Sequence, residues 1–166
     1  MAEQSKASKD LWLLRSANDF REHSIKLLSS TSRQIFVLSK NLDSNIYGQS
    51  QFLDLLSKLA RSGSQVEIKF LVKDFKPAIE SGHPLIKLAQ RLSSKIQLKK
   101  LTQEPENNDM CFMICDTRGL LYQNDETVYQ GFANYNAAPE IKGLKEEFNY
   151  LWERAEVEKE LQLLHI

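Results

Sequence analysis

The sequence predicts an α/β fold in which a mixed, mostly parallel sheet is sandwiched by helices. Apolar runs rich in β-branched residues, at Gln34–Ser39 and Val66–Val72, are typical of strands buried on both faces. Stretches with apolar residues at helical spacing separate these runs and follow them. Strands that alternate with helices place crossover helices on the faces of a parallel sheet.

Local patterns mark the expected elements. Ser16 followed by Asp19 is typical of a capping box that begins a helix, Gly63 suits the end of one, and Pro84 suits a first helical turn. In order, we expect a strand at Leu11–Leu14, a helix from Ser16 to about Ser30, a strand at Gln34–Ser39, a helix at Gln51–Arg61, a strand at Val66–Val72, a short helix or turn from Pro77, a helix at Pro84–Ser93, a strand at Ile96–Leu101, a hairpin of Met110–Cys115 with Leu120–Tyr122, a strand at Val128–Phe132 and a helix at Pro139–Ala155.

Length and composition indicate one globular domain at residues 11–156, with a flexible N-terminal tail at 1–10 and a C-terminal tail at 157–166. Lys plus Arg equals Asp plus Glu at 22 each, so no net charge favours nucleic acid or an anionic membrane. No apolar run approaches the roughly 20 residues of a membrane span, and the N-terminus lacks the apolar core of a secretory signal. Cys111 and Cys115 on one strand would lie about 13 Å apart, too far for a disulfide. We therefore expect a cytoplasmic protein.

Ligands of such sheets bind at the carboxyl ends of the strands. Here that edge gathers Ser39–Asp43, Lys73–Asp74 and the turn Gly82–Pro84. The binding candidates from this edge are Ser39, Asn41, Asp43 and His83.

The stretch Asp109–Asn134 adds a motif. An apolar strand ends at Asp116, and a hairpin then leads to G-F-A-N at Gly131–Asn134. This order resembles the second half of a phospholipase D-type active-site segment, in which the strand begins with H-x-K and four residues separate the Lys from the Asp. Counting back from Asp116, Asp109 stands at the His position and Cys111 at the Lys position. By resemblance, Asp116 and Asn134 join the binding candidates.

The region from about Arg33 to Trp152 resembles one phospholipase D-like half-domain. More narrowly, S-K-N-L-D-S-N-I-Y at Ser39–Tyr47, G-H-P-L-I-K-L-A-Q-R-L at Gly82–Leu92 and G-L-L-Y at Gly119–Tyr122 resemble a bacterial domain of unknown function that often accompanies GNAT-type acetyltransferases. Single-half members of the superfamily form dimers, which makes a homodimer the expected assembly. Apolar residues available for such a contact are Phe148, Trp152, Leu161, Leu163 and Leu164.

The resemblance implies a fold without its chemistry, because the phosphodiesterase needs a nitrogen nucleophile and cationic stabilisation. Asp109 repels a phosphodiester, and Cys111 is nucleophilic only as a thiolate. We therefore predict a pseudoenzyme, a catalytically inactive module that binds a small ligand or a protein partner, with no cofactor and no metal.

Two alternatives stay open. A hydrolase or transferase site would use His83 with Asp43, or Asp116. A nucleic-acid-binding surface would use the lysines in the middle of the chain. Each site candidate also has a structural interpretation: His83 and Asp43 as caps or turn residues, Asp116 as a turn initiator, Asn134 as the holder of a turn, and Cys111 as a core residue.

Overall fold

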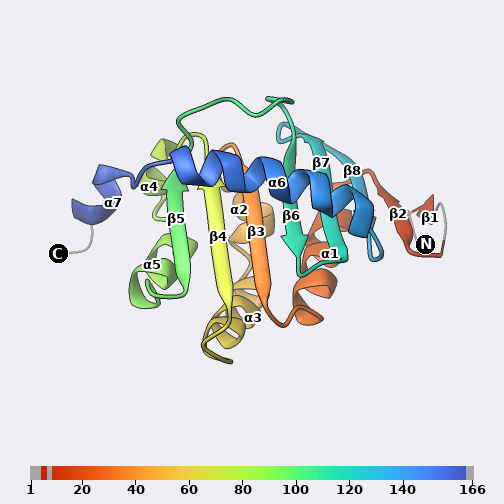
Figure 1. Ribbon diagram of the computed structural model, residues 1–166, viewed down its shortest axis with the longest axis horizontal. Helices are drawn as coiled ribbons and strands as arrows, with labels where there is room; N and C mark the ends of the chain where they lie inside the picture. Colours follow the sequence, from red (N-terminus) through yellow and green to blue (C-terminus); the bar gives the residue numbers. More distant parts are fainter. Residues whose placement is uncertain (1–4, 7–8, 164–166) are drawn as a thin grey trace.

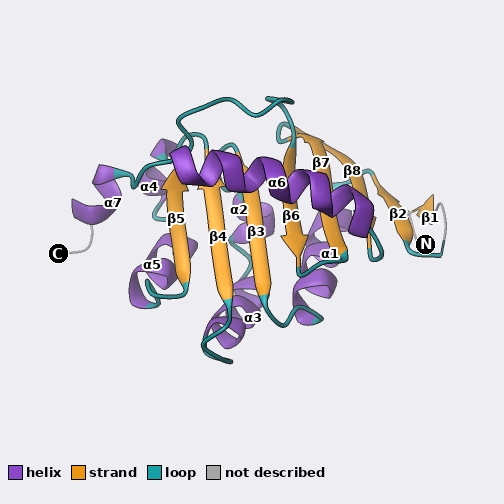
Figure 2. Cartoon of the chain, in the orientation of Figure 1, coloured by secondary structure: helices purple, strands orange, loops and turns teal. Residues whose placement is uncertain are grey.

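One eight-stranded mixed sheet with helices on both faces forms the molecule (Figures 1 and 2). The structure is a computed structural model and describes residues 5–6 and 9–163. The strand order across the sheet is β1-β2-β8-β7-β6-β3-β4-β5. The elements are β1 (Ser5–Lys6), β2 (Leu11–Leu14), α1 (Ala17–Ser29), β3 (Gln34–Ser39), α2 (Ser44–Tyr47), α3 (Ser50–Ala60), β4 (Glu67–Val72), α4 (Lys76–Ser81), α5 (Pro84–Arg91), β5 (Ile96–Lys100), β6 (Cys111–Cys115), β7 (Gly119–Asp125), β8 (Val128–Asn134), α6 (Ala138–Arg154) and α7 (Lys159–Leu163).

The expected mixed sheet and its helical cover are confirmed, but the parallel part is smaller than predicted. Only β3, β4 and β5 pair in parallel, because α3, α4 and α5 supply crossovers between these strands alone. After β5 the chain passes through a long loop above the sheet, and β6 then pairs antiparallel with β3 (Figure 1). The strands β6, β7 and β8 follow one another as hairpins.

Each face of the sheet has its own core. Helices α1, α3 and α5 cover one face, where Phe20, Phe52 and Leu85 are fully buried. Helix α6 crosses the other face (Figure 1), and Phe148 on it stacks on Phe36 of β3 with ring centroids 4.8 Å apart. Alternate residues of β6 therefore face different layers, with Met113 on the first face and Phe112 on the second.

Both segments that were expected to be tails contain regular structure. Strand β1 pairs with β2. In α7, Leu161 is 8% exposed and its carbonyl accepts a hydrogen bond from Gln90 at 3.2 Å. These contacts extend the folded unit beyond residues 11–156. Residues 1–4, 7–8 and 164–166 of the expected tails lie outside the described residues.

The apolar residues expected to serve a homodimer contact mostly pack within the chain. Phe148 is fully buried, and Trp152 and Leu161 are each 8% exposed. They are not available for a subunit interface because the sheet and α5 already cover them. The side chains of Leu163 and Leu164, also named for this contact, lie outside the described part.

The β7–β8 hairpin has a geometry that only glycine permits. The pairing shifts register between Gln123 and Asp125, and the bulge brings the two backbones close together at Gly131. A Cβ atom at Gly131 would lie 1.9 Å from the Tyr122 carbonyl oxygen. Gly131 thus permits the bulge, and the bulged hairpin ends in a turn that carries Glu126 toward β3.

Candidate functional site at the carboxyl end of β3

The carboxyl ends of β3 and β4 and the start of α5 meet at one edge of the sheet, as the sequence predicted. The Lys73 N–H donates to the Ser39 carbonyl at 3.0 Å, and the Asp74 N–H donates to Lys40 at 2.9 Å. Nε2 of His83 lies 3.0 Å from the carbonyl oxygen of Leu42. The segment Ser39–Asp43, called the β3-end loop below, is therefore held by both neighbouring segments.

The carboxylate of Glu126 fills the centre of the β3-end loop. Its Oε1 accepts from the N–H groups of Lys40 at 2.6 Å and Asn41 at 3.0 Å. Its Oε2 accepts from the Ser39 hydroxyl at 2.9 Å and from the Asp43 N–H at 3.1 Å. Converging N–H groups of this kind form an anion-binding nest, and here the anion is a side chain of the protein itself.

Glu126 was not predicted from the sequence. It is one of 22 acidic residues and lies in a hairpin turn, 86 residues from Lys40, with no motif to distinguish it. The turn pattern Asp125–Thr127 predicts a reversal of the chain but not what the carboxylate of that turn contacts. Only the register of β7 and β8 carries it to β3.

An unusual backbone conformation shapes the loop. Leu42 has φ of 61°, a left-handed conformation that costs an L-residue roughly 1–2 kcal/mol. Its side chain is 1% exposed, and its N–H donates to Ser39 Oγ at 2.9 Å. Burial and hydrogen bonds on both its N–H and its carbonyl therefore hold this conformation in place.

His83 is a structural residue in this arrangement. Its Nδ1 accepts the Leu85 N–H at 3.1 Å, which caps α5, and this leaves Nε2–H to donate to Leu42. The side chain is buried, and burial lowers the pKa of His83 against the opposing effects of the Leu42 carbonyl and Asp43. The ring is thus neutral near pH 7, with both nitrogens engaged.

Asp43 is engaged as well. Its Oδ1 accepts the Asn45 N–H at 2.9 Å and so caps α2, while its Oδ2 accepts the Tyr129 hydroxyl at 2.7 Å. The Asn45 side-chain amide donates to the same hydroxyl at 2.8 Å. Asp43 and His83 lie at the same edge of the sheet, but their side-chain hydrogen bonds go to other groups.

The two degenerate motif positions lie beside the β3-end loop. Nζ of Lys40 is 3.5 Å from Asp109 and 3.7 Å from Asp125. Although partial burial disfavours its charge, these carboxylates raise the pKa of Lys40. The Cys111 thiol donates to Glu126 Oε1 at 3.8 Å, and burial followed by the charge of Glu126 raises the pKa of Cys111 to about 12.

Asp116 and Asn134 lie at the other end of the sheet and shape turns. The Asp116 carboxylate accepts the N–H groups of Ser32, Arg33 and Gln34 at 2.9–3.0 Å. Oδ1 of Asn134 accepts the Asn136 N–H at 2.9 Å. The structure therefore brings Ser39, Asn41, Asp43, Asp109 and Cys111 together around Glu126, with His83 behind them and Asp116 and Asn134 apart.

Chemically, this site has one lysine among several carboxylates. Within residues 5–6 and 9–163, no group of three or more His, Cys, Asp or Glu side chains could hold a metal ion. Cys111 and Cys115 are both free thiols and buried. Among the described helices, none is long and apolar enough to cross a membrane.

Two solved structures resemble this one. TrmBL2, an archaeal chromatin protein whose structure shows a novel mode of DNA binding, superposes with a TM-score of 0.65 at 19% identity. That match covers 93% of this chain and 56% of TrmBL2, so this chain spans little more than half of that protein. Nuc from Salmonella typhimurium, a phospholipase D family member, superposes with a TM-score of 0.61 at 10% identity, over 81% of this chain and 88% of Nuc.

The fold is therefore phospholipase D-like, as the sequence resemblance implied. No curated protein matches the chain by sequence. A family model matches residues 16–164, from the N-cap of α1 to just beyond α7. The chain belongs to the family described as Domain of unknown function (DUF7931).

Proposed function

We propose that this chain is a non-catalytic phospholipase D-like domain that acts as a binding module for a ligand or a protein partner. The observation that carries the proposal is the position of Glu126. Its carboxylate accepts hydrogen bonds from three backbone N–H groups and from the Ser39 hydroxyl. These groups lie at the strand end where ligands of such sheets bind. A substrate anion would have to displace the carboxylate.

The groups beside Glu126 support the absence of phosphodiester chemistry. Cys111 is protonated at neutral pH, since burial raises its pKa to about 12, and a thiol is not a nucleophile in that form. Lys40 is paired with Asp109 and Asp125. Carboxylates therefore outnumber cations here, and the local field repels a phosphodiester instead of stabilising its transition state.

A hydrolysis assay tests this proposal. We expect the purified protein to hydrolyse neither bis(p-nitrophenyl) phosphate nor single-stranded DNA above the background rate. Turnover that persists at the same level in Cys111→Ala and in His83→Asn, which keeps a cap at α5, indicates a contaminant. Turnover that disappears in either variant overturns the non-catalytic assignment.

The alternative enzyme, with His83 and Asp43 as its acid and base, has little support from the geometry. Both nitrogens of His83 and both carboxylate oxygens of Asp43 have hydrogen-bond partners inside the fold. A general base needs reach to a substrate proton, and a buried N-cap does not have it. The hydrolysis assay of His83→Asn tests this alternative too.

Nucleic-acid binding is a second candidate because TrmBL2 binds DNA on a related fold. The lysines that suggested it are mostly engaged: Lys69 and Lys99 lie 5.2 and 4.6 Å from the centroid of the Trp152 ring, and Lys73 donates to Asn108. If this candidate is right, binding to DNA weakens steeply between 50 and 200 mM salt, by about 10³-fold or more for six phosphate contacts. Absent or salt-insensitive binding removes it.

The homodimer and the cytoplasmic location stay predictions from the sequence. Sedimentation velocity of the full chain tests the first. A concentration-dependent dimer would need an interface other than the one built on Phe148 and Trp152, because these residues are buried between α6 and the sheet.

A further inference from the structure

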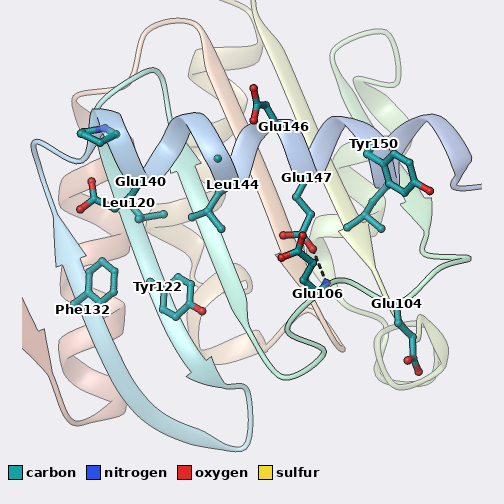
Figure 3. A pocket seen from close by; sticks show the side chains of 13 residues that line it. Glu104, Glu106, Leu120, Tyr122, Phe132, Glu140, Leu144, Glu146, Glu147 and Tyr150 are labelled. Atoms are coloured by element: carbon teal, nitrogen blue, oxygen red, sulfur yellow. Dashed lines mark hydrogen bonds between the residues drawn. The ribbon is translucent and has the colours of Figure 1, made fainter.

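A groove lies on the α6 face of the sheet. It has a volume of about 950 Å³, within the range typical of ligand sites, and lies between α6, strands β7 and β8, and the loop that follows β5 (Figure 3). Cys111 alternates with Phe112 and so points to the opposite face. This α6 groove is therefore separate from the β3-end loop.

The floor of the groove is apolar and aromatic. Tyr122 and Phe132 stack with their ring centroids 5.2 Å apart, and both are only partly buried. Leu144 of α6 is also partly buried, and it lines the groove together with Leu120 of β7 (Figure 3). Adjacent, partly exposed apolar side chains in a concave surface are typical of a binding site.

The rim of the groove is acidic. Five of the thirteen lining residues are glutamates and none is basic, although the whole chain is neutral. They come from two segments, with Glu104 and Glu106 on the loop and Glu140, Glu146 and Glu147 on α6. One of the five anchors the loop, since Glu147 Oε2 accepts the Glu106 N–H at 2.7 Å (Figure 3).

The groove also has an aromatic ring that already holds a cation. The guanidinium of Arg154 lies 3.7 Å from the centroid of the Tyr150 ring, and Tyr150 lines the groove while 50% exposed. Arginine favours such stacking together with bidentate contacts to carboxylates. Aromatic faces with carboxylates around them match a partner that carries both cations and apolar groups.

We propose that the α6 groove binds a basic segment of a partner protein, one with Arg or Lys residues flanking an apolar or aromatic residue. The apolar residue rests on Tyr122, Phe132 and Leu144, and the cations meet the glutamates of the rim. Charge complementarity selects this occupant, because an acidic peptide or a nucleic acid would be repelled. The proposal rests on the binding role proposed above and names the partner's chemistry.

A library of phage-displayed random octapeptides, selected on the folded wild-type protein, tests the proposal. Selected sequences are expected to be rich in Arg or Lys around an apolar residue. Absence of enrichment, or enrichment of acidic or uncharged sequences, overturns it. Displacement of the best peptide by spermine at equal charge concentration also overturns it, since the floor would then contribute nothing.

Variants locate the binding. Gly143 lines the groove, and a Cβ atom there meets nothing within 4 Å, so Gly143→Trp fills the groove without a backbone clash. Gly143→Trp is expected to weaken binding of the best peptide by roughly tenfold or more. The double variant Glu104→Gln, Glu140→Gln is expected to weaken it by roughly three- to tenfold. The matched controls, Asn149→Trp at an exposed position of α6 and Glu80→Gln at an exposed position of α4, should leave affinity within about twofold.

Affinity unchanged in Gly143→Trp, with an unaltered circular dichroism spectrum, places the binding elsewhere and rejects the groove. This failure is distinct from failure of the proposed function. No peptide binding together with no hydrolysis rejects the groove alone, whereas hydrolysis lost in Cys111→Ala rejects the non-catalytic assignment and leaves the peptide result unaffected.

Discussion

The two ends of β3 are built alike but lie in different surroundings. At the amino end, Asp116 accepts the N–H groups of three consecutive residues that lead into the strand. At the carboxyl end, Glu126 accepts those of Lys40, Asn41 and Asp43. Among the described residues, the two non-glycine residues with positive φ are Asp116 at one end and Leu42 at the other.

The difference lies in where the carboxylates come from and what surrounds them. Asp116 begins the turn that follows β6, the strand next to β3, and most of its hydrogen bonds are exposed. Glu126 comes from the β7–β8 hairpin and contacts a buried Ser39 and the thiol of Cys111. A carboxylate that accepts several N–H groups thus fastens the fold at one end, and at the other end it lies at the edge where ligands of such sheets bind.

The largest expected effect comes from the hairpin that delivers Glu126. Gly131→Ala places a Cβ atom 1.9 Å from the Tyr122 carbonyl oxygen, so the bulge cannot form as it is. We expect the free energy of unfolding to fall by about 3 kcal/mol or more, measured by urea denaturation. Gly63→Ala, where an added Cβ meets nothing within 4 Å, is the control. Equal stability of the two variants would show that the hairpin forms without a glycine at this position.

Isosteric amides compare the two carboxylates directly. In Glu126→Gln and in Asp116→Asn the amide NH₂ replaces an oxygen that accepts a backbone N–H, so a donor loses its acceptor at either end. We expect losses of about 2–3 kcal/mol for Glu126→Gln and about 1 kcal/mol for Asp116→Asn, because the first site is more buried. Urea midpoints measure both. A larger loss of stability for Asp116→Asn would contradict this comparison, because the site at the carboxyl end of β3 would then not be the more desolvated of the two.

Acid should weaken the carboxyl end of β3 through His83. Burial lowers the folded-state pKa of His83, so the unfolded chain binds the proton more readily than the folded one. The stability that the neutral ring contributes is therefore fully present above pH 6.5, and it is lost as the pH falls from there through the folded-state pKa. One proton contributes a slope of at most about 1.4 kcal/mol per pH unit. His83→Asn keeps the α5 cap and should lose less stability than wild type between pH 6.5 and 5.

The pKa of His23 is lowered too, chiefly by burial. Wild type and His83→Asn therefore both lose some stability in acid through His23. The informative quantity is therefore the difference between the two pH profiles of the unfolding midpoint. Identical profiles for wild type and His83→Asn would contradict a neutral His83 at this end of the strand.

The smallest effect should come from Lys145, which ties α6 to the amino end. Its Nζ donates to Gln34 Oε1 at 3.0 Å and to the Asp116 carbonyl at 3.3 Å. Lys145→Met keeps the aliphatic stem and should lower the free energy of unfolding by about 0.5–1 kcal/mol. Lys142→Met, at an exposed position of the same helix, should change it by less than about 0.5 kcal/mol. Equal effects would mean that α6 does not support this end.

The strands and helices were largely predictable because each follows from a local pattern. Gln34–Ser39 was predicted with its observed bounds, and the cap at Ser16 and the helix start at Pro84 were also confirmed. The short α2 and the terminal β1 and α7 were not predicted. Such elements carry too few residues to show a period, and their contacts with the rest of the fold hold them.

The candidate site was predictable only in part. The carboxyl ends of parallel strands meet by necessity, so the grouping of Ser39, Asp43 and His83 followed from the predicted topology. The roles of His83 and Asp43 did not, since an N-cap and a catalytic group have the same residue type in a sequence. Glu126 and the glutamates of the α6 groove were missed because they are distant in sequence from the groups around them.

By itself, the sequence determined the order of elements, the phospholipase D-like fold and the replacement of the motif His and Lys by Asp109 and Cys111. Periodicity, turns and motif spacing are local properties, and a chain carries them without folding. Only the tertiary structure decided that Glu126 fills the β3-end loop and that five glutamates surround one groove. Those arrangements depend on strand register and on how α6 lies across the sheet, which pairing and packing of distant segments determine.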